Sequence, residues 1–153
     1  MAIYYFDDDF SKVWPHSSAS LVMTNGVFDI LHRGHVQYLK DAALLNDRLV
    51  VGVNSDESVR TLGKGAERPY IKELDRAFIL NELSSVSDVI IFDQTTPEEL
   101  VACLQPAVFV KGADYSIETL PEAKIVFGYG GKVELIPLSE GYSTTSIVRS
   151  IQS

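Results

Sequence analysis

Short apolar segments recur along the chain, and stretches of mixed polarity separate them. The apolar segments are rich in β-branched residues and do not alternate with polar residues, as in strands that are covered on both faces. They lie at residues 21–23, 49–53, 89–92, 108–110 and 133–136. The pattern therefore predicts about five buried strands.

The stretches between these segments have the spacing of helices. Apolar residues recur at steps of three and four, which line up on one helix face, from Gly34 to about Asn46 and from Leu74 to Leu83. Residues 96–99 combine a capping threonine, a proline in the first turn and a glutamate three residues after the cap. Further helices are predicted over residues 122–127 and from Thr144 or Thr145 almost to the C-terminus.

Strands that alternate with helices predict an α/β fold. We expect a Rossmann-like, doubly wound sheet of about five parallel strands with helices on both faces and right-handed crossovers. Ligands of such sheets bind beyond the carboxyl ends of the strands, near the point where the strand order reverses. Residues 1–18 fit no such unit, so we expect an N-terminal extension, tethered by Phe10 and Trp14, before a single domain over residues 19–153.

Composition narrows the class of protein. The chain has 153 residues, of which 46% are hydrophobic and 22% charged, as in one globular domain. Asp7, Asp8 and Asp9 stand where a secretory signal needs apolar residues, and no apolar run approaches the ~20 residues that span a bilayer. We expect a soluble cytoplasmic protein, with Cys103, the single cysteine, as a small buried residue.

The net charge of −8 argues against nonspecific binding to nucleic acid or to an anionic membrane. It does not argue against an anionic small molecule, because local charge decides that. We therefore expect small-molecule ligands and no nucleic acid or membrane partner.

Residues 24–35 (TNGVFDILHRGH) carry the densest candidate chemistry. This segment follows the first strand and leads into a helix N-terminus, where free N–H groups and the helix dipole favour an anion. His32 and His35 flank Gly34, so two imidazoles can reach one phosphate and stabilise charge that develops on it. Asn25 and Gly26 let the backbone approach a ligand closely. One such feature alone is usually a cap or a turn, but together they predict a phosphate site.

The histidine motif resembles the HxGH signature of the nucleotidyltransferase superfamily that includes cytidylyltransferases and pantetheine-phosphate adenylyltransferase. Further segments, in the same order along the chain, resemble the D-glycero-D-manno-heptose 1-phosphate adenylyltransferase family. This resemblance covers roughly residues 20 to 151. The matching segments are Gly52–Asp56, Lys64-Gly65, Arg68-Pro69, Asp75-Arg76, Val110–Tyr115 and Gly141–Arg149. In many bacteria that domain is fused behind a sugar kinase, and the resemblance implies that this chain is the stand-alone form.

The resemblance implies a reaction and a set of roles. An oxygen of heptose 1-phosphate attacks the α-phosphorus of ATP in line, without a covalent intermediate, and gives ADP-heptose and pyrophosphate for lipopolysaccharide or other cell-surface heptose. Catalytic roles fall to His32, His35 and Lys64. Nucleotide-binding roles fall to Thr24, Asn25, Gly26, Val27, Phe28, Asp29, Gly34, Lys111, Gly112, Asp114, Ser143, Thr144 and Thr145. Sugar-phosphate-binding roles fall to Asn54, Asp56, Arg68 and Arg76.

Several of these residues also have plain structural interpretations. Arg76 is equally compatible with an exposed helix residue, Lys64 with a solvated loop lysine, and any one residue of Ser143–Thr145 with a helix cap. Asp29 either orients the histidines or bonds backbone amides of its loop. Ala113 stands where the family usually has a glycine, which matters if that position needs a positive φ angle.

Magnesium is the expected cofactor, held mainly by the nucleotide phosphates, and no metal ligands are assigned. A homodimer is expected from relatives of this size, and its candidate surface contains Tyr4, Tyr5, Phe6 and Trp14.

Two other functions remain open at this point. A cytidylyltransferase that uses CTP with glycerol 3-phosphate or another alcohol phosphate shares the histidines and the Ser143–Thr145 segment, although residues 54–60 and 111–115 look closer to the heptose family. A non-catalytic nucleotide-binding module needs phosphate-binding backbone but no paired histidines.

Overall fold

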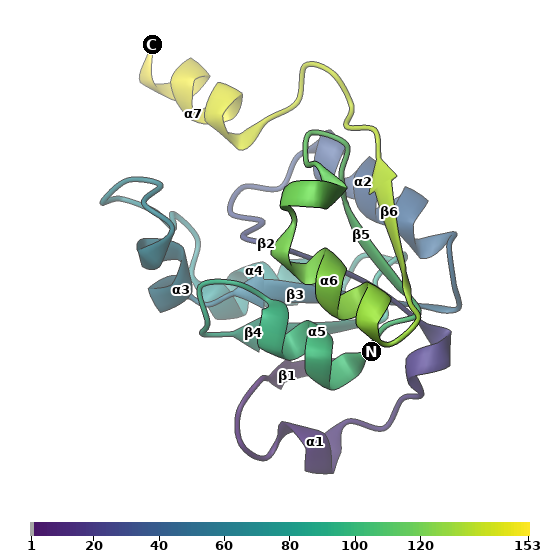
Figure 1. Cartoon of the computed structure of the whole chain (residues 1–153). Helices are drawn as coiled ribbons and strands as arrows, with labels where there is room; N and C mark the ends of the chain where they lie inside the picture. Colours follow the sequence, from purple (N-terminus) through teal and green to yellow (C-terminus); the bar gives the residue numbers. More distant parts are fainter. Residues whose placement is uncertain (1) are drawn as a thin grey trace.

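One parallel sheet of six strands forms the centre of the molecule (Figure 1). The structure is a computed structural model, and it describes residues 2–153. The strand order is β1-β4-β3-β2-β5-β6. The strands are β1 (Ala2–Tyr5), β2 (Leu21–Gly26), β3 (Arg48–Asn54), β4 (Asp88–Phe92), β5 (Val108–Gly112) and β6 (Lys132–Ile136). The order reverses between β2 and β5, so the predicted ligand region lies at their carboxyl ends.

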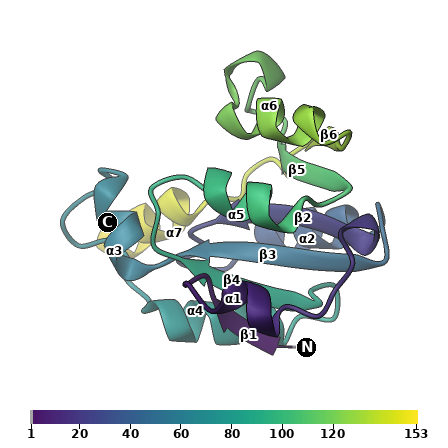
Figure 2. The ribbon, with the colours of Figure 1, turned by 60° about the horizontal axis from the view of Figure 1, so that its bottom comes forward.

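Helices cover both faces of the sheet, as predicted. On one face α2 (Arg33–Ala43) and α4 (Glu73–Asn81) pack onto the sheet. On the other face α5 (Glu98–Leu104) and α6 (Pro121–Gly128) lie side by side, as Figure 2 shows. Neighbouring residues of β2 point to opposite faces: Val22 packs with α2, whereas Leu21 and Met23 pack with α5. Because both faces are buried, the strand is apolar throughout rather than alternating.

Short helices complete the chain. They are α1 (Phe10–Val13), α3 (Asp56–Thr61), α7 (Thr144–Gln152) and two 3₁₀ turns at Ser18–Ser20 and Ile117–Thr119. Ser143 caps α7 by accepting a hydrogen bond from the backbone N–H of Ser146 at 3.0 Å. None of the residues of α7 is buried, and in Figure 1 the helix stands apart from the sheet layers. No helix within residues 2–153 is long and apolar enough to cross a membrane.

The N-terminal segment differs from the prediction. Residues 2–5 do not form an extension outside the sheet but pair in parallel with β4, which raises the number of strands to six. The predicted tether is present: Phe10 is 1% exposed and its ring stacks on that of Trp14, with centroids 5.5 Å apart. The strand was missed because it is short, only half-buried and not followed by a regular helix.

Two smaller predictions can also be compared with the structure. Cys103 lies on the outer face of α5 and is exposed, not buried. Ala113 is not among the residues with a positive φ angle, so its backbone imposes no need for the glycine usual in the family.

The buried ring of Phe10 holds the N-terminal segment against the core, so its loss should destabilise the fold. We expect Phe10→Ala to lower the free energy of unfolding by about 3–5 kcal/mol, measured by urea denaturation. Val13→Ala is the matched control, because Val13 lies in the same helix and is 58% exposed. Equal midpoints and slopes for Phe10→Ala and the wild type would contradict this role.

Candidate active site

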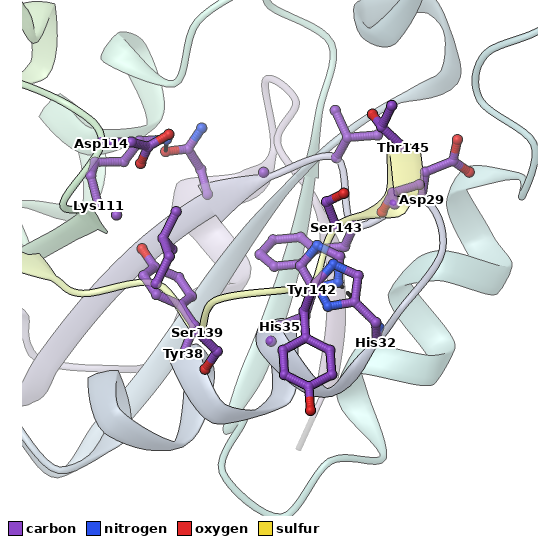
Figure 3. A pocket seen from close by; sticks show the side chains of 18 of the residues that line it. Asp29, His32, His35, Tyr38, Lys111, Asp114, Ser139, Tyr142, Ser143 and Thr145 are labelled. Atoms are coloured by element: carbon purple, nitrogen blue, oxygen red, sulfur yellow. Dashed lines mark hydrogen bonds between the residues drawn. The ribbon is translucent and has the colours of Figure 1, made fainter. Parts of the chain in front are cut away.

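A cavity of about 440 Å³ opens at the carboxyl ends of β2 and β5 (Figure 3). Its walls come from the segment between β2 and α2, the loop after α3, the end of β5 and the segment before α7. Predicted site residues that line it are Asn25, Gly26, Val27, Phe28, Asp29, His32, Gly34, His35, Lys64, Arg68, Lys111, Gly112, Asp114, Ser143, Thr144 and Thr145. Segments far apart in the sequence thus meet at the predicted place.

Three tyrosines of this cavity were not among the predicted site residues. Tyr38, Tyr115 and Tyr142 line it, together with Leu138 and Ser139. In a sequence, a tyrosine on a helix or loop has the same pattern whether it faces the core, solvent or a ligand. Nothing in the local sequence separated these cases.

The two histidines of the motif form a stacked pair. Their ring centroids are 3.9 Å apart with 26° between the planes. The backbone N–H of His32 donates to Nδ1 of His35 at 3.3 Å, so neutral His35 carries its proton on Nε2. Nδ1 of His32 is buried and has no hydrogen-bond partner within the described residues 2–153. A buried atom cannot reach a ligand, so the pair can contact one through Nε2 rather than through Nδ1 of His32.

Burial also sets the charge of this pair. Desolvation and, to a smaller extent, the neighbouring His32 together lower the pKa of His35 to about 4. Burial lowers the pKa of His32 as well. Both rings are thus neutral donors near pH 7 until an anion arrives to favour the charged form.

Two glycines permit the close packing around the pair. A Cβ atom on Gly34 would lie 2.9 Å from the His32 ring and 3.0 Å from Cβ of Tyr142. A Cβ atom on Gly26 would lie 2.9 Å from the ring of Phe28, whose φ of 52° folds it back over the strand end. The glycines are therefore required by the protein's own side chains, before any ligand is considered.

At the β5 end of the cavity, Lys111 is the main positive group. Its Nζ donates to Oδ1 of Asn25 at 3.1 Å and lies 4.6 Å from the centre of the Tyr115 ring. Burial lowers the pKa of Lys111, and the carboxyl groups of Glu122 and Asp114 oppose that shift. This end combines a cation, an aromatic face and amide groups, a suitable set for a nucleoside.

The start of α7 closes another side of the cavity. Oγ1 of Thr144 donates to the backbone carbonyl of Ile30 at 3.1 Å, which joins this helix to the segment before α2. Ser143, Thr144 and Thr145 all line the cavity. Two helix N-termini, those of α2 and α7, thus converge on one space, and both favour an anion.

Thr24, predicted to bind nucleotide, lies beneath the cavity instead. It is fully buried and donates to the carbonyl of Val110 at 2.9 Å, while its oxygen hydrogen-bonds the Tyr38 hydroxyl at 2.7 Å. This contact joins β2, β5 and α2. Thr24 supports the cavity floor and does not reach the cavity.

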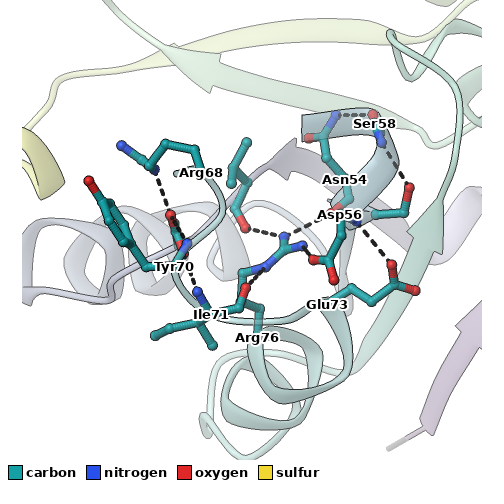
Figure 4. Close-up of polar contacts among 11 residues, drawn as sticks. Asn54, Asp56, Ser58, Arg68, Tyr70, Ile71, Glu73 and Arg76 are labelled. Atoms are coloured by element: carbon teal, nitrogen blue, oxygen red, sulfur yellow. Dashed lines mark hydrogen bonds and ion pairs between the residues drawn. The ribbon is translucent and has the colours of Figure 1, made fainter. Parts of the chain in front are cut away.

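Arg76, predicted to bind the sugar phosphate, is buried in a network of its own (Figure 4). It is 1% exposed, and its guanidinium donates to the carbonyls of Ile71, Val27 and Asn54 and to Oδ1 of Asp56, each at 2.8 Å. These bonds occupy the guanidinium. The sugar-phosphate role is therefore corrected to a structural one.

Asn54 and Asp56 belong to the same network and also lie outside the cavity. Nδ2 of Asn54, which is 3% exposed, donates to Oγ of Ser58 at 2.9 Å. Asp56 accepts from Arg76, and its backbone N–H donates to Glu73 at 3.0 Å. Of the four residues predicted to bind sugar phosphate, the structure brings Arg68 to the cavity and leaves the other three outside it.

No group of three or more histidine, cysteine, aspartate or glutamate side chains within residues 2–153 is placed to hold a metal ion. The carboxylates that line the cavity are Asp29, which already accepts three hydrogen bonds, and Asp114. This donor set suits a divalent ion held mainly by a ligand's own oxygens.

Comparison with known proteins identifies related sequences over most of the chain. A family model described as cytidylyltransferase-like matches residues 23–150. A bifunctional protein HldE of Geotalea uraniireducens is 53% identical over 133 residues, which are 87% of this chain and 27% of that protein. The D-beta-D-heptose 1-phosphate adenylyltransferase of Bordetella bronchiseptica is 52% identical over 132 residues, which are 86% of this chain and 82% of that protein. The chain thus spans under a third of the bifunctional relatives and most of the single-function one.

Solved structures agree with the fold. The lipopolysaccharide core biosynthesis protein from Thermoplasma volcanium superposes with a TM-score of 0.63 and 32% identity, over 80% of this chain and 98% of that one. Pantothenate synthetase from Thermus thermophilus superposes with a TM-score of 0.65 over 97% of this chain and 70% of that one, but with 15% identity it supports the fold alone.

The burial of Arg76 leads to a prediction that distinguishes a structural role of this residue from a role in ligand binding. Removing one partner of a buried ionic network leaves groups without partners, so we expect Arg76→Met to lose about 3–5 kcal/mol of unfolding free energy, measured by urea denaturation. Arg60→Met on the exposed side of α3 is the control, with a change within about 0.5 kcal/mol. A fully stable Arg76→Met variant with impaired acceptor binding would restore the sugar-phosphate role.

Proposed function

Because the chain belongs to the cytidylyltransferase-like family, we propose that it is an adenylyltransferase of ADP-heptose synthesis. It transfers AMP from ATP to D-glycero-β-D-manno-heptose 1-phosphate and releases pyrophosphate. The observation that carries the proposal is the stacked His32–His35 pair at the start of α2, inside a cavity at the reversal of strand order. The 52% identical adenylyltransferase of Bordetella bronchiseptica supports ATP and the heptose phosphate as substrates.

The chemistry requires no covalent enzyme intermediate. An oxygen of the sugar phosphate attacks the α-phosphorus, and the bond between that phosphorus and the oxygen bridging to the β-phosphate breaks on the opposite side. The protein must then position two anions and stabilise charge on the leaving pyrophosphate. Preorganised donors in a partly desolvated cavity suit both tasks.

The residues of the cavity divide this work by position. His35 donates from Nε2 to the transferring phosphate, and His32 to an adjacent phosphate oxygen. The N-terminus of α7, with Ser143, Thr144 and Thr145, binds the β- and γ-phosphates. Lys111 and Asp114 flank the nucleoside at the β5 end of the cavity. Lys64 and Arg68 come from the loop after α3, and Lys64 acts as the catalytic cation over the phosphates while Arg68 meets the acceptor.

Magnesium fits this site as an ion that arrives with ATP. Asp114 is the free carboxylate of the cavity, and the triphosphate supplies the other oxygens. The ion's chemical contribution is to neutralise the triphosphate and make pyrophosphate a better leaving group.

We also propose the cytoplasm as the compartment, because ATP and sugar phosphates are cytoplasmic metabolites. A homodimer also stays a proposal, and the aromatic surface that could form its interface is smaller than the sequence indicated. Tyr4, Phe6 and Trp14 pack around Phe10, and Tyr5, at 44% exposed, is the member of that group left on the surface.

Pyrophosphate release across a substrate panel tests the function. ATP and CTP are each combined with heptose 1-phosphate, other sugar 1-phosphates, glycerol 3-phosphate and phosphoethanolamine. We expect turnover with ATP and heptose 1-phosphate that exceeds every other pair at least tenfold. Turnover confined to CTP and an alcohol phosphate would overturn the assignment in favour of a cytidylyltransferase.

Removal of the His35 ring tests the catalytic role. We expect His35→Ala to fold and to bind ATP, measured by calorimetry, while kcat falls about 10²–10³-fold, as when one preorganised donor to a developing anion is lost. Lys40→Ala, exposed on the same helix, is the control and should keep full activity. Undiminished turnover by His35→Ala would instead favour a site in which this histidine is not catalytic.

A further inference from the structure

Asp29 is a buried carboxylate whose hydrogen bonds all run to one distant turn. It is 2% exposed, and it accepts from Nε of Arg68 at 2.6 Å, from the N–H of Tyr70 at 2.9 Å and from the N–H of Ile71 at 2.9 Å. Figure 4 shows Arg68, Tyr70 and Ile71, the residues that supply these donors, close together. The contacts therefore follow neither of the two alternatives that the sequence left open, orienting the histidines or bonding amides of its own loop, but fix residues 68–71.

These bonds determine which nitrogen atoms of the Arg68 guanidinium remain for a ligand in the cavity. Its Nε is committed to Asp29, and its guanidinium lies 5.2 Å from the ring centre of Tyr70. Within residues 2–153, Nη1 and Nη2 have no hydrogen-bond partner in the protein, and Arg68 lines the cavity. A planar guanidinium held at Nε presents these two donors as a fork, which matches two oxygens of a phosphate.

Asp29 also anchors one end of the segment that carries Lys64. The loop of residues 62–71 connects α3 to α4 and contains Gly63 and Gly65, both with positive φ angles. Its first part is exposed, whereas its last part is bonded to Asp29. The carboxylate thus sets the direction from which Lys64 enters the cavity.

The position of Asp29 in the cavity indicates which of the two substrates lies near it. In Figure 3, Lys111 and Asp114 lie at one end of the cavity and Asp29 at the other, with His35 between them. A nucleoside at the Lys111 end and a transferring phosphate at His35 leave the Asp29 end for the leaving phosphates, at the start of α7, and for the second anion, for which Arg68 is the nearby cation. Asp29 is three residues before His32, so one short segment carries both the acceptor anchor and the phosphate donors.

We propose that Asp29 is a positioning residue for the sugar phosphate: it orients Arg68 and the 62–71 loop so that the acceptor oxygen faces the α-phosphorus. This role rests on the proposed function, and it replaces the nucleotide-binding role assigned to Asp29 from the sequence. The acceptor class it fits is a phosphate monoester, bound at two oxygens by the Arg68 fork.

Separate Michaelis constants for the two substrates test the proposal. Asp29→Asn keeps the size of the side chain but replaces one of its two accepting oxygens with an NH₂ group and removes the negative charge beside Arg68. We expect KM for the sugar phosphate to rise at least tenfold and KM for ATP to stay within twofold. Asp41→Asn on α2, which accepts from Gln37, is the control and should change neither constant. A rise in KM for ATP equal to that for the sugar phosphate would overturn the proposal.

Arg68→Ala provides a second variant in which Asp29 keeps its bonds to the backbone. We expect it to raise KM for the sugar phosphate by a similar factor, and Asp29→Asn added to it to worsen KM by less than twofold, because Asp29 acts through Arg68. If KM for the sugar phosphate in the double variant rises by the product of the two single effects, the residues act independently and the proposal is contradicted.

Hydrogen exchange of the wild-type protein tests the anchor without any variant or activity. We expect the N–H groups of Tyr70 and Ile71 to exchange at least tenfold more slowly than those of Gly63–Glu67, although neither segment is in a helix or strand. Equal exchange rates would overturn the anchor. If the substrate panel reveals a different acceptor, the proposed function fails by that result, whereas the exchange rates and the KM split with that acceptor still decide the role of Asp29.

Discussion

The buried guanidinium of Arg76 is the constraint on which the site's geometry depends. A charge that is 1% exposed is tolerated only when its donors are satisfied, so the protein must bring acceptors to it from several directions. Those acceptors are carbonyls of Val27, Asn54 and Ile71 and the carboxylate of Asp56. The guanidinium therefore joins the ends of β2 and β3 to the start of α4. The segment that carries both histidines leaves β2 in a direction set by this bond to Val27.

The cavity gathers positive side chains that suit an anionic ligand. The chain has a net charge of −8, yet Lys64, Arg68 and Lys111 line one space. Burial lowers the pKa of Lys111 and of both histidines, so burial disfavours the charged form of each of these groups. A bound polyphosphate opposes these shifts. The site is thus a set of prepared donors whose full charge develops with its ligand.

The central strands and the histidine segment could be predicted from the sequence because their signals are local. A strand buried on both faces is apolar throughout, and a strand end that leads into a helix with paired histidines is a contiguous motif. Edge strand β1 has neither property. Arg76 and Asn54 were misassigned because a position at a strand or helix end does not reveal which way the side chain points. Asp29 lines the cavity, but its contacts could not be predicted because its partners lie about forty residues away in the chain.

An open sheet also has two edges, and the strands at those edges limit how copies of the chain can associate. The outer backbone groups of an edge strand are a template for a further strand, and charges there oppose such pairing. Strand β1 has four residues and is followed closely by Asp7, Asp8 and Asp9. At the other edge, β6 exposes Lys132 and Glu134. Growth of the sheet from chain to chain is therefore disfavoured at both ends.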